Sequence, residues 1–269
     1  MMGKTRIIKG HFDEGEFWGD VTYGPLGCGK SRREIRVLGE LRGETEIFIV
    51  DGEQVELVVW PDWDAWRDWL VFMPEDFLGK LDFVEQKGRQ LPSLVWDDAG
   101  VWASNQRWAE EFSKDVTQYI NVMRSDFANI TLTTPNPLWL LKGFRTLPGG
   151  HTTRINRSTG NKYQKHLRYG RCYEGWMSPD FKKTGVKPLF DDWFSTRMTK
   201  KTSEEYMAVR RTYASKMKEK LKATYNRMKE EGKEKEAKNW RRDLKEGAGV
   251  EIEDDEEPAA DLLKRALKD

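Results

Sequence analysis

The chain has 269 residues, and its 46 Lys and Arg residues are balanced by 45 Asp and Glu residues. The formal net charge of +1 says nothing about partners by itself, so local charge clusters have to be considered. Cys28 and Cys172, the only cysteines, exclude a disulfide framework and a cysteine metal cluster. No apolar run approaches the roughly 18 residues of a membrane span, and the polar N-terminus is no signal peptide. We expect an intracellular, cytoplasmic protein of one large domain, with or without appendages.

Residues 24–31 match the phosphate-binding pattern G-x-x-x-x-G-K-[ST]. Glycines let the backbone curl until successive N–H groups point at phosphate oxygens. We expect Lys30 to reach the β- and γ-phosphates and the Ser31 hydroxyl to bind Mg²⁺, with a helix over Arg32–Arg42 adding its positive N-terminal end. The alternative is a glycine-rich turn followed by a chance Lys-Ser pair. The residues expected to contact the nucleotide are Gly24, Pro25, Leu26, Gly27, Cys28, Gly29, Lys30, Ser31 and Arg32.

The segments around this loop have the local patterns of strands and helices. Residues 1–16 are mixed and polar, with an edge strand expected over Arg6–Ile8, and Phe17–Tyr23 is the strand that leads into the loop. Two β-rich runs flank the turn signal Asp51-Gly52, and two helical patterns with proline near the first turn follow. The runs are Glu46–Val50 and Val55–Trp60, and the helices are Pro61–Val71 and Pro74–Lys87.

A second motif begins at Leu91, where an apolar strand ends in the acids Asp97 and Asp98. This is the Walker B arrangement, in which the first carboxylate holds Mg²⁺ through water. The second, Asp98, stands where a general base or water-orienting acid is needed. The alternative is a strand followed by an ordinary Asp-Asp-Ala-Gly turn.

A third strand is expected at Ala128–Thr134, after a long amphipathic helix over residues 106–123. Its exit, Thr133 to Pro137, places small polar side chains at a strand tip beside the Walker B strand of a parallel sheet. A helix over Leu138–Phe144, followed by Arg145, continues the chain.

These three motifs resemble the core motifs of the additional-strand catalytic P-loop ATPases, a class that includes AAA+ proteins, RecA-like motors and the FtsK/HerA/Zot group. The resemblance covers residues 17–157 and is greatest to small ATPases of archaeal viruses and plasmids. It implies a three-layer α/β fold with a mainly parallel central sheet, ATP and Mg²⁺ as ligands, and Thr134 or Asn136 as the γ-phosphate sensor. Two features depart from the family pattern: Asp98 replaces the usual Glu, and threonines replace the sensor glutamine of FtsK/HerA-like proteins.

The resemblance also raises the question of an arginine finger. In ring ATPases a neighbouring subunit inserts an arginine that stabilises charge on the transferring phosphoryl group. Arg145, after the sensor strand, and Arg124, before it, stand where such residues occur. The alternative for each is a surface arginine paired with a nearby carboxylate.

Residues 151–173 carry basic residues and tyrosines in the pattern of a β-hairpin that turns at Ser158–Asn161. Period-two alternation places Tyr169, Arg171 and Tyr173 on one face and Arg168 on the other. Such a surface suits a nucleic-acid backbone and stacked bases, but it also suits a tyrosine face packed on the core. The basic residues are Arg154, Arg157, Lys162, Lys165, Arg168 and Arg171.

The remaining chain is expected to be an appendage. Residues 178–198 contain Pro179, Gly185 and Pro188 and are expected to be irregular, with Trp193 and Phe194 docking them on the core. A capped start at Thr202 opens a charged helix to Lys245 with a break near Gly232. An acidic run over residues 251–257 and a short amphipathic helix over 259–267 suit a protein-docking peptide or a decoy for basic surfaces.

The expected organisation is therefore a P-loop core (1–157), a basic hairpin with connector (158–198), a helical extension (199–246) and an acidic linker with a terminal helix (247–269). We expect a Mg²⁺-dependent ATPase that acts on DNA as a homo-oligomeric ring. A small-molecule or nucleotide kinase, and a non-hydrolysing nucleotide switch in assembly, are the alternatives.

Overall fold

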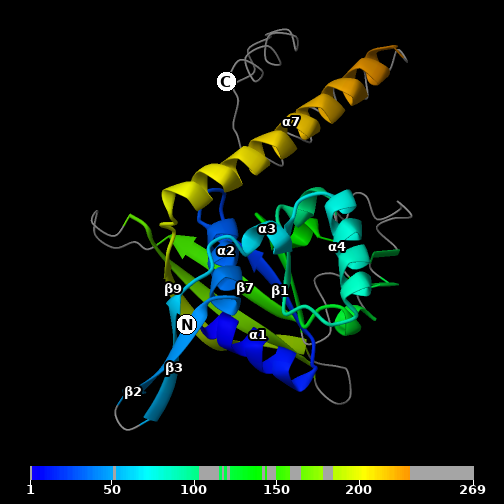
Figure 1. Cartoon of the computed structure of the whole chain (residues 1–269). Coiled ribbons are helices and arrows are strands. Elements are labelled where there is room, and N and C mark those ends of the chain that lie inside the picture. Colours follow the sequence, from blue (N-terminus) through cyan, green and yellow to red (C-terminus); the bar gives the residue numbers. More distant parts are fainter. Residues whose placement is uncertain are drawn as a thin grey trace. The chain divides into compact units, whose positions relative to one another are not determined.

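A seven-stranded sheet forms the centre of the fold, with the order β4-β5-β6-β1-β7-β8-β9 (Figure 1). The computed structural model describes residues 2–50, 53–102, 115–116, 118–119, 122–140, 143, 150–157, 165–177 and 184–230, and all structural statements concern these residues. The strands of this sheet are β1 (Trp18–Tyr23), β4 (Leu70–Val71), β5 (Leu94–Trp96), β6 (Asn129–Thr134), β7 (His151–Arg157), β8 (Leu167–Met177) and β9 (Thr184–Ser195).

The sheet is mainly parallel, as the sequence predicts. Strands β4, β5, β6, β1 and β7 run parallel to one another, whereas β8 pairs antiparallel with both β7 and β9. The strand that precedes the glycine-rich loop, β1, does not pair with β5, because β6 lies between them.

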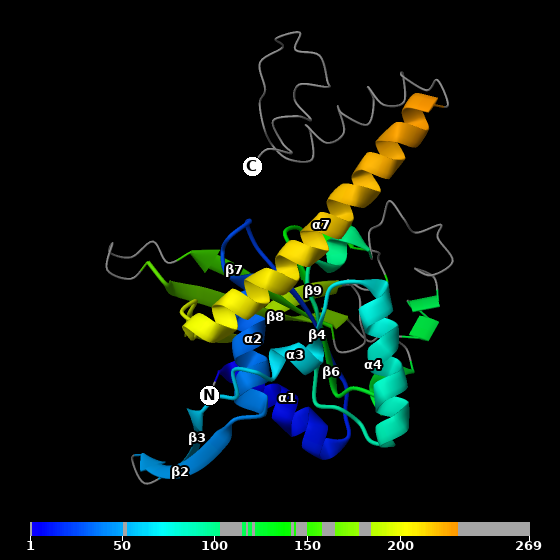
Figure 2. The same cartoon turned by 45° about the horizontal axis from the view of Figure 1, so that its top comes forward.

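Helices cover both faces of the sheet. On one face, α1 (Gly3–Glu14) and α2 (Lys30–Leu41) lie side by side (Figures 1 and 2). The side chain of Lys4 in α1 reaches Asp20 of β1. On the other face, α4 (Pro74–Lys87) stacks Phe77 on Trp96 of β5 with the ring centroids 5.2 Å apart. The protein therefore has the three layers expected of the P-loop fold.

A separate two-stranded hairpin extends from the end of α2. Strands β2 (Glu44–Val50) and β3 (Glu53–Trp60) pair antiparallel, which confirms the two runs predicted around Asp51-Gly52. Both views show it extending away from the central sheet (Figures 1 and 2). Ile47 and Ile49 remain 69% and 68% exposed.

Three predicted elements were wrong. Residues 6–8 belong to helix α1 rather than to an edge strand, because α1 buries the polar residues Lys4 and Thr5 and so lacks a simple apolar stripe. Of the helix predicted over Pro61–Val71, only α3 (Trp66–Trp69) is helical, and the chain then enters the sheet as β4.

The segment predicted to be irregular is the third wrong prediction, since most of it forms strand β9. Its Pro188 is tolerated because β9 is the edge strand, and the ladder with β8 shifts register beside its partner Tyr173. Phe194 is buried as predicted, whereas Trp193 is 60% exposed.

The C-terminal helix α7 (Lys200–Glu230) starts earlier than the sequence suggests. The side chain of Thr199 accepts a hydrogen bond from the N–H of Thr202, so Thr199 is the N-cap and Thr202 lies inside the helix. The chain divides into two units, Met1–Ala208 and Val209–Asp269. The expected boundary at residue 157 falls between β7 and β8, which pair in one sheet.

Several predicted features lie wholly or mainly outside the described residues. The helix predicted over Leu138–Phe144 is seen only as the 3-10 turn η4 (Pro137–Trp139), and most of the helix over 106–123 is not described. The end of the charged helix and residues 247–269 also lie outside. Among the helices that are described, none combines the length and the apolar character needed to cross a bilayer.

Candidate nucleotide-binding site

The glycine-rich loop joins β1 to α2 and needs its glycines for two reasons. Gly24, Gly27 and Gly29 have φ values of 150°, 71° and 103°, a region that side chains rarely adopt. The loop also approaches its neighbours closely: a Cβ at Gly24 would lie 2.4 Å from the carbonyl oxygen of Ile155, and one at Gly29 would lie 2.7 Å from Thr196 Cγ2. Cys28, a residue of this loop, is buried and forms part of the hydrophobic core.

The start of α2 presents positive charge at this loop. Lys30 Nζ donates to the carbonyl oxygens of Gly24 and Pro25 at 2.8 and 3.2 Å, so its ammonium group lies over the loop. Gly29 is the N-cap, and no side chain caps the first turn. Uncapped N–H groups at a helix start, together with a lysine ammonium group, fit the phosphates of a nucleotide.

Asp97, directly after β5, lies against the same helix start. Its Oδ1 accepts hydrogen bonds from Ser31 Oγ at 2.8 Å and from Thr133 Oγ1 at 2.5 Å, and the residue is 0% exposed. The structure therefore brings together Ser31 and Asp97, which are far apart in the sequence. A hydroxyl and a carboxylate are the hard oxygen donors that Mg²⁺ prefers, so these residues fit that cation.

Asp98 adopts a backbone conformation that no other described non-glycine residue shows. Its φ is 51°, in the left-handed region, and its N–H donates to Thr133 Oγ1 at 2.9 Å. Asp tolerates this conformation better than most side chains. Unlike Asp97, Asp98 is half-buried, so its carboxyl group is partly accessible to solvent.

The residues expected as sensors lie at the same edge of the sheet. Thr134 is paired with Tyr23, the last residue of β1 before the loop. Its hydroxyl donates to the carbonyl oxygen of Asn136 at 3.0 Å, and Asn136 Oδ1 accepts from the N–H of Leu138. In this state, Asn136 caps a short turn.

Of the two candidate finger arginines, the structure describes only Arg124. Arg124 is exposed and lies in the 3-10 turn η3 (Met123–Ser125), where its carbonyl oxygen accepts from the Gln90 side chain. Because η3 precedes β6, Arg124 lies at the opposite end of that strand from Thr134. Arg145 lies outside the described residues.

The basic residues of the hairpin do not form one uniform surface. Arg168 Nε donates to the carbonyl oxygen of Cys28 at 3.0 Å, which places this arginine against the phosphate-binding loop. Arg171 makes a two-pronged ion pair with Asp191 at 2.8 and 2.9 Å. Arg154 and Lys165 are exposed. Lys162 and the side chain of Arg157 lie outside the described part of the chain.

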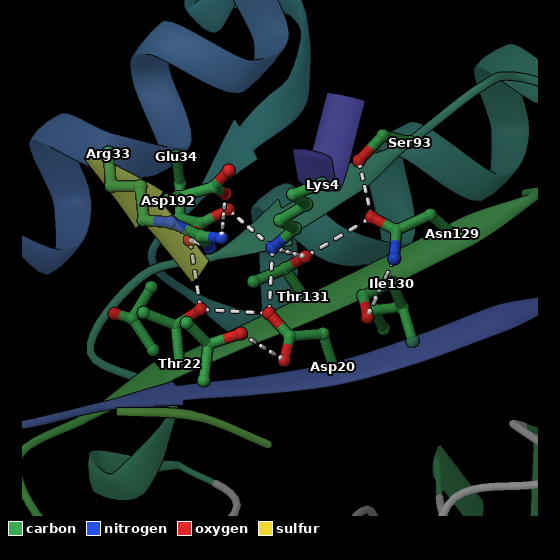
Figure 3. A network of polar contacts seen from close by, with 12 residues as sticks. Lys4, Asp20, Thr22, Arg33, Glu34, Ser93, Asn129, Ile130, Thr131 and Asp192 are labelled. Carbon is green, nitrogen blue, oxygen red and sulfur yellow. Dashed lines mark hydrogen bonds and ion pairs between the residues drawn. The ribbon is translucent and has the colours of Figure 1, made fainter. Parts of the chain in front are cut away.

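A buried charge network ties α2 to the sheet (Figure 3). Lys4 Nζ donates to Asp20 at 2.8 Å, to Glu34 at 2.6 Å and to Thr131 Oγ1 at 2.8 Å. Arg33 bridges Glu34 at 2.9 Å and Asp192 of β9 at 2.8 Å. The network could not be predicted from the sequence, because these members come from five separate elements.

Burial and the neighbouring charges shift the pKa values of the residues in this network. Burial alone would raise the pKa of Asp20, but the positive charges of Lys4 and Arg33 outweigh it and hold that pKa below the ordinary value. Burial alone would lower the pKa of Arg33, yet Glu34, Asp192 and Asp20 raise it. Burial raises the pKa of the neighbouring Cys172 thiol to about 12, so this cysteine stays protonated.

Comparison with known proteins finds similarity to a viral protein. No known family profile matches it. It is 26% identical over 133 residues to the uncharacterized protein B-251 of Sulfolobus spindle-shape virus 1, a match that covers 49% of each chain. The chain thus spans about half the length of this curated relative.

Two solved structures are similar at low TM-scores. The N-terminal domain of the zonular occludens toxin from Neisseria meningitidis has a TM-score of 0.35 and 14% identity, over 70% of this chain and 98% of that one. The genome-packaging NTPase B204 from Sulfolobus turreted icosahedral virus 2, in complex with ATP-gammaS, has a TM-score of 0.34 and 10% identity, over 65% and 99%.

Three features of the structure define the fold of the chain. The glycine-rich loop lies between β1 and α2, β6 separates β1 from β5, and Ser31 contacts Asp97 across that gap. Together these features give the chain the fold of a P-loop NTPase.

Proposed function

We propose that this chain is a magnesium-dependent ATPase that acts on DNA as a homo-oligomer. The observation that carries the proposal is the 2.8 Å contact between Ser31 Oγ and Asp97 Oδ1, because Ser31 directly follows Lys30 at the start of α2. A phosphate-binding cation and an oxygen donor set for Mg²⁺ then belong to one helix start, as hydrolysis of a nucleoside triphosphate requires.

Each residue of the pocket has a role in this proposal. Lys30 exchanges the loop carbonyl oxygens of Gly24 and Pro25 for phosphate oxygens, and Ser31 with Asp97 holds the cation. Bound Mg²⁺ would neutralise charge on the phosphates. Asp98, the more accessible of the two acids, accepts a proton from the attacking water or orients it. The γ-phosphate sensors are Thr134 and Asn136, at the end of β6.

DNA is the proposed partner because strands β7 and β9 and the turn before β8 carry exposed cations and an exposed aromatic side chain. Arg154 and Lys165 are exposed, and so is the Trp193 side chain on β9. Phosphate contacts by such cations and base stacking on aromatic rings are the usual elements of single-strand binding. We assign the contacts to Arg154, Arg157, Lys162 and Lys165, since Arg171 is paired with Asp191. In a ring, Arg145 or Arg124 would act on the neighbouring subunit.

Nucleotide binding and phosphate release by the full chain test this proposal. Lys30→Ala should lower ATP affinity by at least tenfold, and Asp98→Asn should keep affinity but lower turnover by about 10²–10⁴-fold. Lys216→Ala, at an exposed position of α7, is the matched control and should change neither. ATP affinity that is unaffected by Lys30→Ala would remove the basis of the proposal.

The alternatives predict different results in the same assays. DNA that stimulates phosphate release supports the motor, whereas release that depends on a phosphate acceptor supports a kinase. A wild type that binds ATP and releases no phosphate, with or without DNA, supports a nucleotide switch. Asp98 has a shorter side chain than the Glu that is usual in the additional-strand catalytic ATPases. This departure at the position of the catalytic acid makes the non-hydrolysing switch the second candidate.

A further inference from the structure

A tyrosine from the C-terminal helix completes the surroundings of Asp97. Tyr206 OH donates to Asp97 Oδ2 at 2.9 Å, and Tyr206 is only 3% exposed. Ser31 and Thr133 both donate to the other oxygen, Oδ1. One oxygen of the carboxylate therefore accepts from Ser31 and Thr133, and the other accepts from Tyr206 of α7. This helix begins more than 100 positions after Asp97 in the sequence.

The ring of Tyr206 is held by packing as well as by its hydroxyl. Trp66 meets it edge-on with centroids 5.8 Å apart, and Phe72 lies at 6.2 Å. The neighbouring Glu205 pairs with Arg67, which precedes β4. The first turns of α7 are thus attached to the segment that leads into the sheet beside β5.

We propose that Tyr206 is a positioning residue that holds the Asp97 carboxylate in the orientation that receives Mg²⁺, and that it thereby couples metal–nucleotide binding to the start of α7. This inference rests on the proposed function, because it assigns Asp97 to the metal. A carboxylate with two oxygens can rotate about its terminal bond, and a donor fixed to Oδ2 restricts that rotation while Oδ1 remains directed at Ser31.

The coupling must act in both directions. If Tyr206 favours the metal-binding orientation of Asp97, then bound Mg²⁺–nucleotide favours the conformation in which Tyr206 donates, and it stabilises the first turns of α7 by the same free energy. The nucleotide state is then communicated to α7 without any contact between that helix and the phosphates.

Tyr206→Phe tests the proposal, because it keeps the ring and removes only the hydroxyl. With ATPγS as the probe, we expect unchanged affinity in EDTA and a Mg²⁺ midpoint for tight binding that is about tenfold higher than in the wild type. Tyr225→Phe, the same substitution further along α7, should behave as the wild type. A midpoint that is unchanged or lower in Tyr206→Phe overturns the inference.

Hydrogen exchange of residues 200–208 gives an independent reading. In the wild type, Mg²⁺–ATPγS should slow exchange there relative to ATPγS in EDTA, and Tyr206→Phe should abolish the difference. If the variant fails to fold, the wild-type measurement alone is decisive. Exchange that is not slowed by Mg²⁺–ATPγS in the wild type overturns the coupling. A wild type that binds no ATPγS instead contradicts the proposed function, so the two failures are distinguishable.

Discussion

Buried charges at the centre of the molecule shape the behaviour of individual residues. Lys4 and Arg33 face Asp20, Glu34 and Asp192, and all five side chains are 0–3% exposed. Removing one member of such a cluster leaves an uncompensated charge, which is worse than an apolar core. The depressed pKa of Asp20 means that the folded chain binds its proton less tightly than the unfolded chain. The ionised carboxylate therefore stabilises above about pH 4, and this contribution is lost as the pH falls through the folded-state pKa.

Lys4→Met should lower the free energy of unfolding by about 3–5 kcal/mol at neutral pH, because Asp20 and Glu34 lose their shared cation. Without Lys4 the pKa of Asp20 must rise, so the defect should shrink as the pH is lowered toward 5. Urea denaturation at both pH values measures this. Arg6→Met, at an exposed position of α1, is the control; equal losses in the two variants would contradict the role of the network.

At the scale of elements, the loop between β1 and α2 depends on close approach to β7. The Cβ of an alanine at Gly24 would meet a backbone oxygen of Ile155, which cannot rotate away as a side chain can. Gly10 of α1 and Gly79 of α4 are different, because a Cβ at either position would meet nothing within 4 Å. The same residue type therefore has opposite significance in the loop and at these two helical positions.

Gly24→Ala should lower the free energy of unfolding by about 1–3 kcal/mol through steric overlap. Gly79→Ala, in the middle of α4, should raise it by about 0.5–1 kcal/mol, because alanine loses less backbone entropy in a helix. Thermal and urea unfolding of the two variants give the comparison. Stabilisation by Gly24→Ala would mean that the loop does not pack against β7 as described.

At the scale of the whole first unit, Asp192 joins elements from opposite ends of the sequence. Its Oδ1 accepts from the N–H of Gly3 at 2.7 Å, at the start of α1, while its Oδ2 binds Arg33 of α2. Strand β9 is thus fixed to both helices on that face of the sheet. We expect α1, α2 and β9 to open together as one cooperative unit.

Asp192→Asn should lower the free energy of unfolding by about 1.5–3 kcal/mol and reduce amide protection in α1, α2 and β9 together, because a charged hydrogen-bond acceptor is lost. Native-state hydrogen exchange measures this. Asp191→Asn is the matched control: its partner Arg171 is exposed, so little change is expected. Loss of protection confined to β9 would contradict the single unit.

By itself, the sequence determined the elements whose signals are local. The pattern G-x-x-x-x-G-K-[ST], the two acids after an apolar strand and the proline at the start of α4 each reflect constraints within a few residues, and they lie where predicted. They also supplied the residue types of the candidate site, namely Lys30, Ser31 and Asp97.

Only the tertiary structure decided which distant side chains contact the phosphate-binding loop, Asp97 and α2. Arg168 donates to the loop, Tyr206 donates to Asp97, and Lys4 lies in the core, where it binds Glu34 of α2. The helix α1 was not predicted for the same reason, since its buried face includes the polar residues Lys4 and Thr5, whose hydrogen-bond partners include residues of β1 and α2. Local periodicity reports which face of a segment is apolar, whereas a buried polar contact depends on a partner that folding alone brings within reach.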